Sequence, residues 1–158
     1  MDIKLLVTDV DGTLTDGGMY YDVQGNEWKR FDTRDGMGIS RLRAAGIAVM
    51  LLTGEDTPIV TRRAEKLQVE YCFLGTKDKE AFLAIFFEEH PAFSWDTTAY
   101  IGDDVNDLPP IRRVAWSAAP ADAQQPVLAA ADYICKAEGG HGAVREFCER
   151  ILAQGYEK

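Results

Sequence analysis

The chain has 158 residues, 46% of them apolar and 27% charged, which is typical of a globular protein with one ordinary core. Its net charge of −9 argues against nucleic acid or an anionic membrane surface as the main partner, because polyanions are bound by clustered Lys and Arg. Neither a signal-peptide pattern nor a membrane-spanning apolar run is found, so we expect a soluble, cytoplasmic protein with a small-molecule ligand.

Short apolar runs alternate with longer helical patterns, which is typical of a parallel sheet covered by helices on both faces. The expected strands are Ile3–Thr8, Ile47–Leu52, Tyr71–Leu74 and Thr98–Ile101, with weaker runs at Val114–Trp116 and Tyr133–Cys135. The expected helices are Met37–Ala45, Pro58–Leu67, Lys79–Glu89 and Ala143–Ala153. We therefore predict a Rossmann-like, doubly wound α/β fold in a single domain over residues 1–158.

Residues 17–32 interrupt this alternation. Two aromatic runs, Met19-Tyr20-Tyr21 and Trp28-Lys29-Arg30-Phe31, flank the turn-forming sequence Gln24-Gly25-Asn26. This pattern predicts a β-hairpin flap over the sheet. An irregular loop whose aromatic side chains cover the sheet edge is the alternative.

Polar residues follow the expected strands directly at their carboxyl ends, where open α/β sheets bind ligands. In chain order they are Asp9 and Asp11, then Thr53 and Gly54, then Asp103, Asp104 and Asp107. Carboxylates gathered at one edge repel one another unless a cation neutralises them, and oxygen ligands without His or thiolate favour Mg²⁺. Acidic turns that cap helices would explain any one of these residues, but not all of them at successive strand ends.

Asp9 and Asp11 are suited to divide the work of phosphoryl transfer. One carboxylate attacks phosphorus to form an aspartyl phosphate, while the other protonates the leaving alkoxide and then deprotonates the attacking water. A hydroxyl and an ammonium are expected around the phosphate. Thr53 supplies the hydroxyl, and Lys77 and Lys79 compete for the ammonium, with Lys79 favoured by its place beside the third strand end.

Four motifs resemble those of the haloacid dehalogenase (HAD) superfamily, in the same order: DVDGT at residues 9–13, LLTG at 51–54, DKEA at 78–81 and GDDVND at 102–107. The resemblance implies that Asp9 is the nucleophile and Asp11 the general acid/base. It implies that Thr53, Gly54 and Lys79 bind phosphate. It also implies that Mg²⁺ is held by the side chains of Asp9 and Asp103 and the backbone carbonyl of Asp11, with Asp104 and Asp107 as nearby supports.

The stretch between Asp11 and Thr53 has room for a hairpin and one helix, but not for a separate cap domain. The chain is therefore expected to be a capless member of the superfamily with an open site. Such enzymes usually obtain a lid over the substrate by oligomerising.

Residues 15–39 and 139–146 look like the 8-phosphate phosphatases of 3-deoxy-D-manno-octulosonate (KDO) and the related 9-phosphate phosphatases of nonulosonates such as 2-keto-3-deoxynononate (KDN). This likeness implies a homotetramer in which hairpins meet at the centre and cover neighbouring sites. Octulosonate enzymes usually have Arg where this chain has Glu55. Glu55, followed by Arg63 and Lys66, looks more like the nonulosonate phosphatases, whereas Arg34-Asp35-Gly36 resembles the eight-carbon pattern.

We expect a KDN or sialic acid 9-phosphate phosphatase, with a KDO-8-phosphate phosphatase as the alternative. The substrate-binding residues are expected to be Thr33, Arg34, Glu55, Arg63, Lys66 and Arg145. For Arg63 and Lys66 the alternative is a solvated helix face paired with Glu65, and Arg145 could reach a neighbouring site or only its own surface.

Two alternatives of another class are a phosphorylation-dependent receiver domain and a HAD-like module kept only for oligomerisation. A receiver accepts phosphate on a later strand, whereas the DVDGT motif follows the first strand. The intact set of Asp9, Asp11, Thr53, Lys79 and Asp103 argues against an inactive module.

Overall fold

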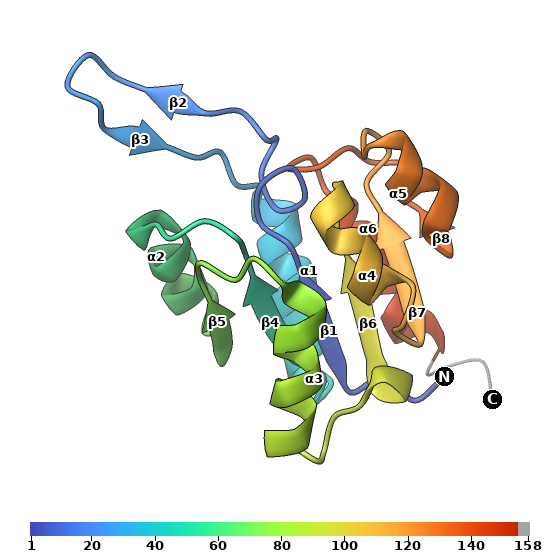
Figure 1. Ribbon diagram of the computed structural model, residues 1–158. Helices are drawn as coiled ribbons and strands as arrows, with labels where there is room; N and C mark the ends of the chain where they lie inside the picture. Colours follow the sequence, from blue (N-terminus) through green and yellow to red (C-terminus); the bar gives the residue numbers. More distant parts are fainter. Residues whose placement is uncertain (155–158) are drawn as a thin grey trace.

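A six-stranded parallel sheet forms the centre of the protein, which is described over residues 1–154 by a computed structural model (Figure 1). The strand order is β5-β4-β1-β6-β7-β8, so the chain builds one half of the sheet outward from β1 and then crosses to build the other. The strands are β1 (Leu5–Thr8), β4 (Ala48–Leu52), β5 (Tyr71–Phe73), β6 (Thr98–Ile101), β7 (Trp116–Ala119) and β8 (Tyr133–Ile134). The predicted doubly wound α/β fold is confirmed.

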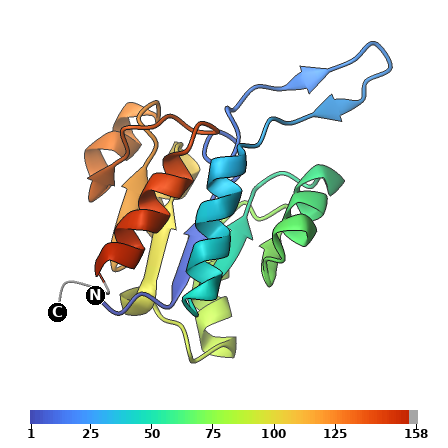
Figure 2. The same cartoon turned by 180° about the vertical axis from the view of Figure 1, so that it is seen from behind.

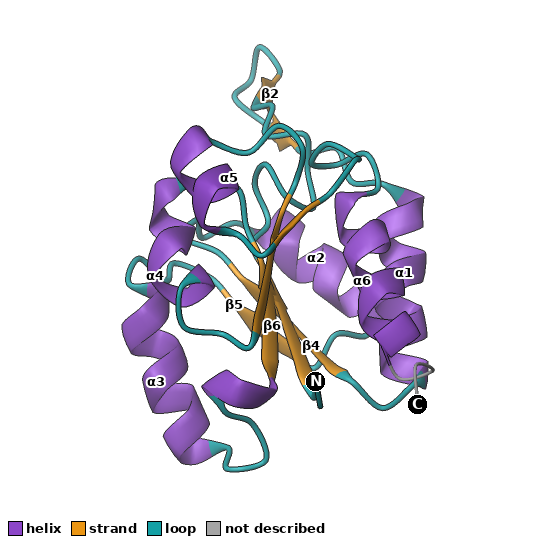
Figure 3. Cartoon of the chain, turned by 90° about the vertical axis from the view of Figure 1, so that its right-hand side faces the viewer, coloured by secondary structure: helices purple, strands orange, loops and turns teal. Residues whose placement is uncertain are grey.

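Helices cover both faces of the sheet, as the edge-on view in Figure 3 shows. One face carries α1 (Thr33–Ala44), α2 (Pro58–Leu67) and α6 (Ala143–Gln154), which are nearest the viewer in Figure 2. The other carries α3 (Lys79–Glu89), α4 (Leu108–Ile111) and α5 (Gln125–Ala130). Short 3₁₀ turns at Trp95–Thr97 and Val105–Asp107 precede β6 and α4. Within residues 1–154, no helix is both long and apolar enough to cross a bilayer.

Side-chain caps fix where three of these helices begin. Asp32 accepts a hydrogen bond from the backbone N–H of Arg34, Thr57 caps α2 ahead of Pro58, and Asp78 caps α3. Because Asp32 is the N-cap, α1 begins at Thr33 and not at the expected Met37. The caps of α1 and α3 also orient the first turns of both helices toward the carboxyl edge of the sheet.

The part of the chain between β6 and β8 differs most from expectation. We expected a strand at Val114–Trp116, but β7 runs from Trp116 to Ala119. Val114 belongs to the turn that ends α4, since its N–H donates to the carbonyl of Pro110. After Trp116 the strand consists of the small residues Ser117, Ala118 and Ala119, whose weak strand propensity makes its apolar pattern inconspicuous. The short helices α4 and α5 contain proline in their first turns and were not predicted.

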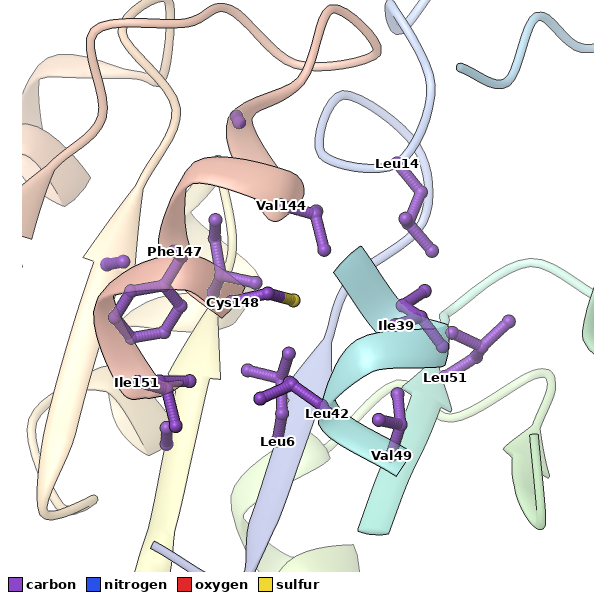
Figure 4. Packing of buried hydrophobic residues seen from close by; sticks show 14 of the residues in the cluster. Leu6, Leu14, Ile39, Leu42, Val49, Leu51, Val144, Phe147, Cys148 and Ile151 are labelled. Atoms are coloured by element: carbon purple, nitrogen blue, oxygen red, sulfur yellow. The ribbon is translucent and has the colours of Figure 1, made fainter. Parts of the chain in front are cut away.

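Each face of the sheet has its own hydrophobic core. Because successive strand residues point to opposite faces, Leu6 of β1 enters one core while Leu5 and Val7 enter the other. Strands buried on both faces are apolar throughout, which explains the unbroken apolar runs of the sequence. Figure 4 shows the core beneath α1 and α6, where Leu42 and Phe147 pack around Leu6.

A β-hairpin projects from the carboxyl edge of the sheet, as Figure 1 shows. Its strands are β2 (Tyr20–Tyr21) and β3 (Glu27–Trp28), with Tyr20 opposite Trp28. The side chain of Asp22 holds the turn by accepting hydrogen bonds from the backbone of Gln24 and Asn26. The predicted hairpin is confirmed. Between β1 and β4 the structure contains only this hairpin, α1 and their connections, so no separate cap domain is present there.

Candidate active site

A cavity of about 250 Å³ opens at the carboxyl ends of β1, β4 and β6. Three segments far apart in the sequence bring their side chains to it because their strands are neighbours in the sheet. Its lining consists of Asp9, Asp11, Thr53, Gly54, Glu55, Lys77, Asp103, Asp104 and Asn106. The sequence-predicted residues at the strand ends therefore do come together.

The loop after β1 turns sharply so that Asp9 and Asp11 both reach this cavity. The turn is closed by the carbonyl of Val10, which accepts hydrogen bonds from the backbone N–H groups of residues 13–15. Gly12 has φ +84°, and a Cβ there would lie 2.1 Å from Oδ2 of Asp103. Both the backbone conformation and the close approach of Asp103 therefore require glycine at this position.

A second loop, before α6, supports the loop that carries Asp9. A Cβ on Gly139 would lie 1.9 Å from the carbonyl oxygen of Gly12. The N–H of Gly140 donates to the carbonyl of Thr13 at 3.0 Å. The glycines of the segment 139–146 thus allow two backbones to pack directly on each other, which explains why this segment accompanies the DVDGT motif.

Lys79 is the buried cation of the site. Its Nζ lies 2.7 Å from Oδ1 of Asp9 and 2.7 Å from Oδ1 of Asp107, and its side chain has no exposed surface. Burial by itself lowers the pKa of Lys79, but the two carboxylates outweigh it, so that its pKa lies above the ordinary value. The ammonium is therefore charged, and it ties the end of β1 to the turn after β6.

The carboxylate of Asp107 is fully occupied by protein groups. Its Oδ1 accepts hydrogen bonds from Lys79 and from the hydroxyl of Tyr100. Its Oδ2 accepts from the backbone N–H groups of Asp103 at 3.0 Å and Asp104 at 3.2 Å. Asp107 therefore fixes the loop that presents Asp103, as expected of a supporting residue.

The remaining carboxylates fit a divalent cation. Oxygens of Asp9, Asp103 and Asp107 lie within 4.8 Å of one another. Burial, followed by the charge of Asp107, raises the pKa of Asp9 well above its ordinary value despite the contact with Lys79. Burial raises the pKa of Asp103 to about 6. Since the oxygens of Asp107 are taken, Asp9 and Asp103 are the pair whose unbalanced charge a metal ion would neutralise.

The end of β4 forms the opposite wall of the cavity. Thr53 is only 2% exposed, and its hydroxyl oxygen accepts a hydrogen bond from the N–H of Glu55. Lys77 donates from its ammonium to the carbonyl of Gly54 at 2.8 Å. Of the two lysines that competed for the phosphate-binding role, Lys79 lies in the buried centre of the site and Lys77 at its rim.

Lys29 is a charged residue of this region that the sequence analysis did not single out. Its Nζ lies 2.6 Å from Oδ1 of Asp11, 3.2 Å from Oε1 of Glu27 and 4.0 Å from Oε2 of Glu55. Burial lowers its pKa, but Asp11 and Glu27 more than compensate, so the pKa lies above the ordinary value. The signal was present, since Glu27 of β3 and Lys29, the residue after β3, are two apart in extended chain and so point to the same side.

Five of the six expected substrate-binding residues do not line the cavity within the described part of the chain; they are Thr33, Arg34, Arg63, Lys66 and Arg145. Glu55 does line it. The guanidinium of Arg34 pairs with Asp32 at 2.9 Å, and that of Arg145 pairs with Glu149 at 2.7 Å. Thr33 and Lys66 are exposed. The roles of these five residues stay predictions.

Arg63 does not follow the alternative of a solvated helix face. Its guanidinium donates to the carbonyl of Asp32 at 3.3 Å and lies over the ring of Phe31. It is therefore packed against the base of the hairpin rather than paired with Glu65 on a solvated helix face.

Comparison with known proteins places the chain in a family. No protein-family model matches it. It is 44% identical over 154 residues to the KDO-8-phosphate phosphatase KdsC of Haemophilus influenzae. The match covers 97% of this chain and 85% of the relative. A similar solved structure is the crystal structure of the KDO-8-phosphate phosphatase of Moraxella catarrhalis with a magnesium ion, a phosphate ion and KDO. Its TM-score is 0.92 and its sequence identity 37%, over 96% of this chain and 87% of that one.

A protein of Legionella pneumophila described as a HAD superfamily (subfamily III A) hydrolase has a TM-score of 0.95 and 40% identity, over 99% of this chain and 85% of that one. The similarity thus extends over nearly the whole chain in both sequence and structure. The resemblance stated from the motifs is confirmed, as is the prediction of a phosphoric monoester hydrolase. The chain belongs to the KDO-8-phosphate phosphatase family of the HAD superfamily.

Proposed function

We propose that this protein is a Mg²⁺-dependent phosphatase that removes phosphate from KDO 8-phosphate. The observation that carries the proposal is the convergence of Asp9, Asp11, Thr53 and Asp103 on one strand-end cavity beside the buried ammonium of Lys79. The eight-carbon substrate is supported by the names of the relatives. A phospho-receiver or an inactive module has no comparable support.

Asp9 is the proposed nucleophile. Lys79 holds its Oδ1, which leaves Oδ2 to attack phosphorus. The new Asp9–phosphorus bond forms as the bond from phosphorus to the sugar oxygen breaks, and Asp11 gives its proton to that leaving oxygen. Asp11 then takes a proton from water, which attacks the aspartyl phosphate, releases inorganic phosphate and restores Asp9.

Thr53 and Lys79 are the proposed binders of the phosphate oxygens. An ammonium has three N–H donors, and Lys79 uses two of them on Asp9 and Asp107, so one remains for the substrate. The side chains of Asp9 and Asp103, with the backbone carbonyl of Asp11, would hold Mg²⁺. Bound there, the ion supplies positive charge that neutralises the phosphate oxygens.

The eight-carbon alternative replaces the nine-carbon substrate that we favoured from the sequence. That preference depended mainly on Glu55, which stands where octulosonate enzymes usually have Arg. In the structure the carboxylate of Glu55 lies 4.0 Å from the ammonium of Lys29, so a group of the same chain already faces it. Glu55 nevertheless lines the cavity, and the nonulosonate therefore stays in the test as the competing substrate.

The exposed apolar side chains of the hairpin support the proposed homotetramer. Tyr21 and Trp28 are each 62% exposed, and Val23 is 97% exposed. Large apolar groups gathered on a projecting ribbon mark a protein interaction site. A second copy of the chain is the partner that the resemblance implies, with hairpins meeting at the centre and covering neighbouring sites.

The net charge of −9 supports the remaining expectation about partners, and the cytoplasm stays the expected location. The charge fits a protein that binds a small anionic sugar through a local cationic site. It does not fit binding to nucleic acid or to an anionic membrane.

The first prediction concerns the substrate. Among KDO 8-phosphate, KDN 9-phosphate, N-acetylneuraminate 9-phosphate and glucose 6-phosphate, we expect the highest kcat/KM for KDO 8-phosphate, by at least about tenfold, which is roughly 1.4 kcal/mol of transition-state binding. Steady-state phosphate release with Mg²⁺ measures this ranking. A higher kcat/KM for either nine-carbon substrate would overturn the eight-carbon proposal while leaving the phosphatase intact.

The second prediction concerns the metal. At about pH 8, where a carboxyl of pKa about 6 is ionised, Asp103→Asn removes a charge that the metal-free fold holds at a cost, so its Tm in EDTA should exceed that of the wild type. Mg²⁺ should raise the Tm of the wild type by binding the folded state, and should raise that of Asp103→Asn much less. Asp96→Asn, an exposed change far from the site, should behave as the wild type in both conditions. An equal Mg²⁺ effect in all three proteins would refute the metal assignment.

The third prediction concerns the assembly. Light scattering should give a tetramer for the wild type and a smaller species for Trp28→Lys, because the substitution places a charge on the exposed face of the hairpin. Ile85→Lys is the matched control, since Ile85 is also an exposed apolar residue, at 57%, but lies on α3. A fully active wild-type monomer would contradict the shared lid.

A further inference from the structure

Lys29 connects the hairpin to the catalytic loop. It follows β3 directly, and its side chain has no exposed surface because it lies between the hairpin and the strand ends. The shortest of its contacts, at 2.6 Å, is with Oδ1 of Asp11. No other basic residue of residues 1–154 forms an ion pair with Asp11.

The two oxygens of Asp11 have different surroundings. Oδ1 accepts the hydrogen bond from Lys29, whereas Oδ2 is buried and has no hydrogen-bond partner within the described residues. Buried carboxylate oxygens are normally hydrogen-bonded, so a free one beside a cavity is an unusual feature that calls for a reason. A proton-transferring carboxylate needs such an oxygen, since it must reach the substrate without releasing a protein partner.

Two further carboxylates hold the ammonium of Lys29 in place. The carboxylate of Glu27, in β3, lies 3.2 Å from the ammonium of Lys29. The carboxylate of Glu55, in the segment that follows β4, lies 4.0 Å from it. A buried ammonium with a single partner would be poorly compensated for the loss of its hydration, whereas three carboxylates keep it charged. Glu27 of the hairpin and Glu55 after β4 thus hold the ammonium of Lys29 in place, and its contact with Asp11 is held with it.

From this arrangement we propose that Lys29 is a positioning residue for Asp11: it binds Oδ1 and thereby turns Oδ2 toward the leaving oxygen of the substrate. The inference depends on the proposed phosphatase function and adds to it a part for the hairpin. A hairpin that moves away takes Lys29 with it and releases Asp11, so proton transfer depends on the hairpin's being in place. Small misplacements of a reacting group are costly in rate, which gives this contact its importance.

The test compares substrates whose leaving groups differ in their need for a proton. The leaving alkoxide of a sugar phosphate needs the proton from Asp11, whereas 4-nitrophenolate leaves readily without one. We compare kcat/KM because it covers the steps up to formation of the aspartyl phosphate. For Lys29→Met we expect a loss of about tenfold to a hundredfold on KDO 8-phosphate, within the usual range of general acid catalysis, and less than about threefold on 4-nitrophenyl phosphate.

Three further measurements separate positioning from a structural role. The KM of Lys29→Met for KDO 8-phosphate should change little, because the loss lies in kcat. Lys29→Arg should restore part of the activity, since a guanidinium also donates to a carboxylate. In a double-mutant cycle, Lys29→Met should add almost nothing to Asp11→Asn, because the group it positions is already gone. Lys136→Met, an exposed change of the same charge, should leave both substrates unaffected.

Glu27→Gln keeps the proposal testable if Lys29→Met does not fold or assemble. It weakens the anchor of Lys29 without removing the ammonium, so we expect a smaller loss that is again confined to the sugar phosphate. Equal losses on both leaving groups, or no loss in either variant, would overturn the role of Lys29. A wild-type enzyme that does not hydrolyse KDO 8-phosphate would instead refute the proposed function, and the two failures are distinguishable.

Discussion

The buried ion pair of Lys79 with Asp9 and Asp107 is the interaction on which the site depends. Five acidic side chains reach the end of the sheet from β1 and β6 and line or adjoin one cavity: Asp9, Asp11, Asp103, Asp104 and Asp107. Within that group the ammonium of Lys79 compensates two carboxylates at 2.7 Å each. Losing Lys79 would leave the buried carboxylates of Asp9 and Asp107 without a cationic partner, which is strongly destabilising. The charge that Lys79 does not neutralise, on Asp9 and Asp103, is what suits the site to a metal ion and, through it, to phosphate.

Glycine allows these charged groups to be brought so close. At Gly12 and Gly102 a Cβ would collide with the side chains of Asp103 and Asp107, and at Gly139 it would collide with the backbone of Gly12. The catalytic loop is thereby held between the turn after β6 and the loop before α6. Segments that are far apart in the sequence therefore determine the position of Asp9, the proposed nucleophile, and the rigid layers of the α/β fold supply that precision.

The sequence predicted the centre of the site well because its chemistry is local. Asp9 and Thr53 directly follow strands and Asp103 follows β6 after one glycine, and parallel strands that are neighbours must bring such residues to the same edge. The cap at Asp78 and the motif around Lys79 are local signals of the same kind. The strand at Trp116–Ala119 was misplaced because small residues give a weak apolar pattern, and α4 and α5 were missed because they are too short for periodicity to reveal.

The periphery of the site could not be predicted in the same way. The contact of Lys29 with Asp11 depends on how the hairpin folds back, which no local pattern specifies beyond the shared face of Glu27 and Lys29. Glu55 pointed to the nine-carbon substrate when considered as an isolated residue, whereas its environment includes the ammonium of Lys29. In the proposed assembly the hairpins of neighbouring subunits cover the site, and single-chain patterns are least informative about such contacts.

The most direct test of the account is to trap the phosphorylated enzyme. The enzyme would be mixed with sugar phosphate labelled at phosphorus and quenched in acid within milliseconds, which shows whether the protein carries phosphate. In a parallel sample, tritiated borohydride would convert the aspartyl phosphate to homoserine with loss of the phosphate, so that tritium marks the modified residue. We predict label on the peptide that contains Asp9, and none in Asp9→Asn, which should remain folded but release no phosphate. Rapid phosphate release with no labelled protein, or label on another residue, would contradict the assignment of Asp9 as the nucleophile.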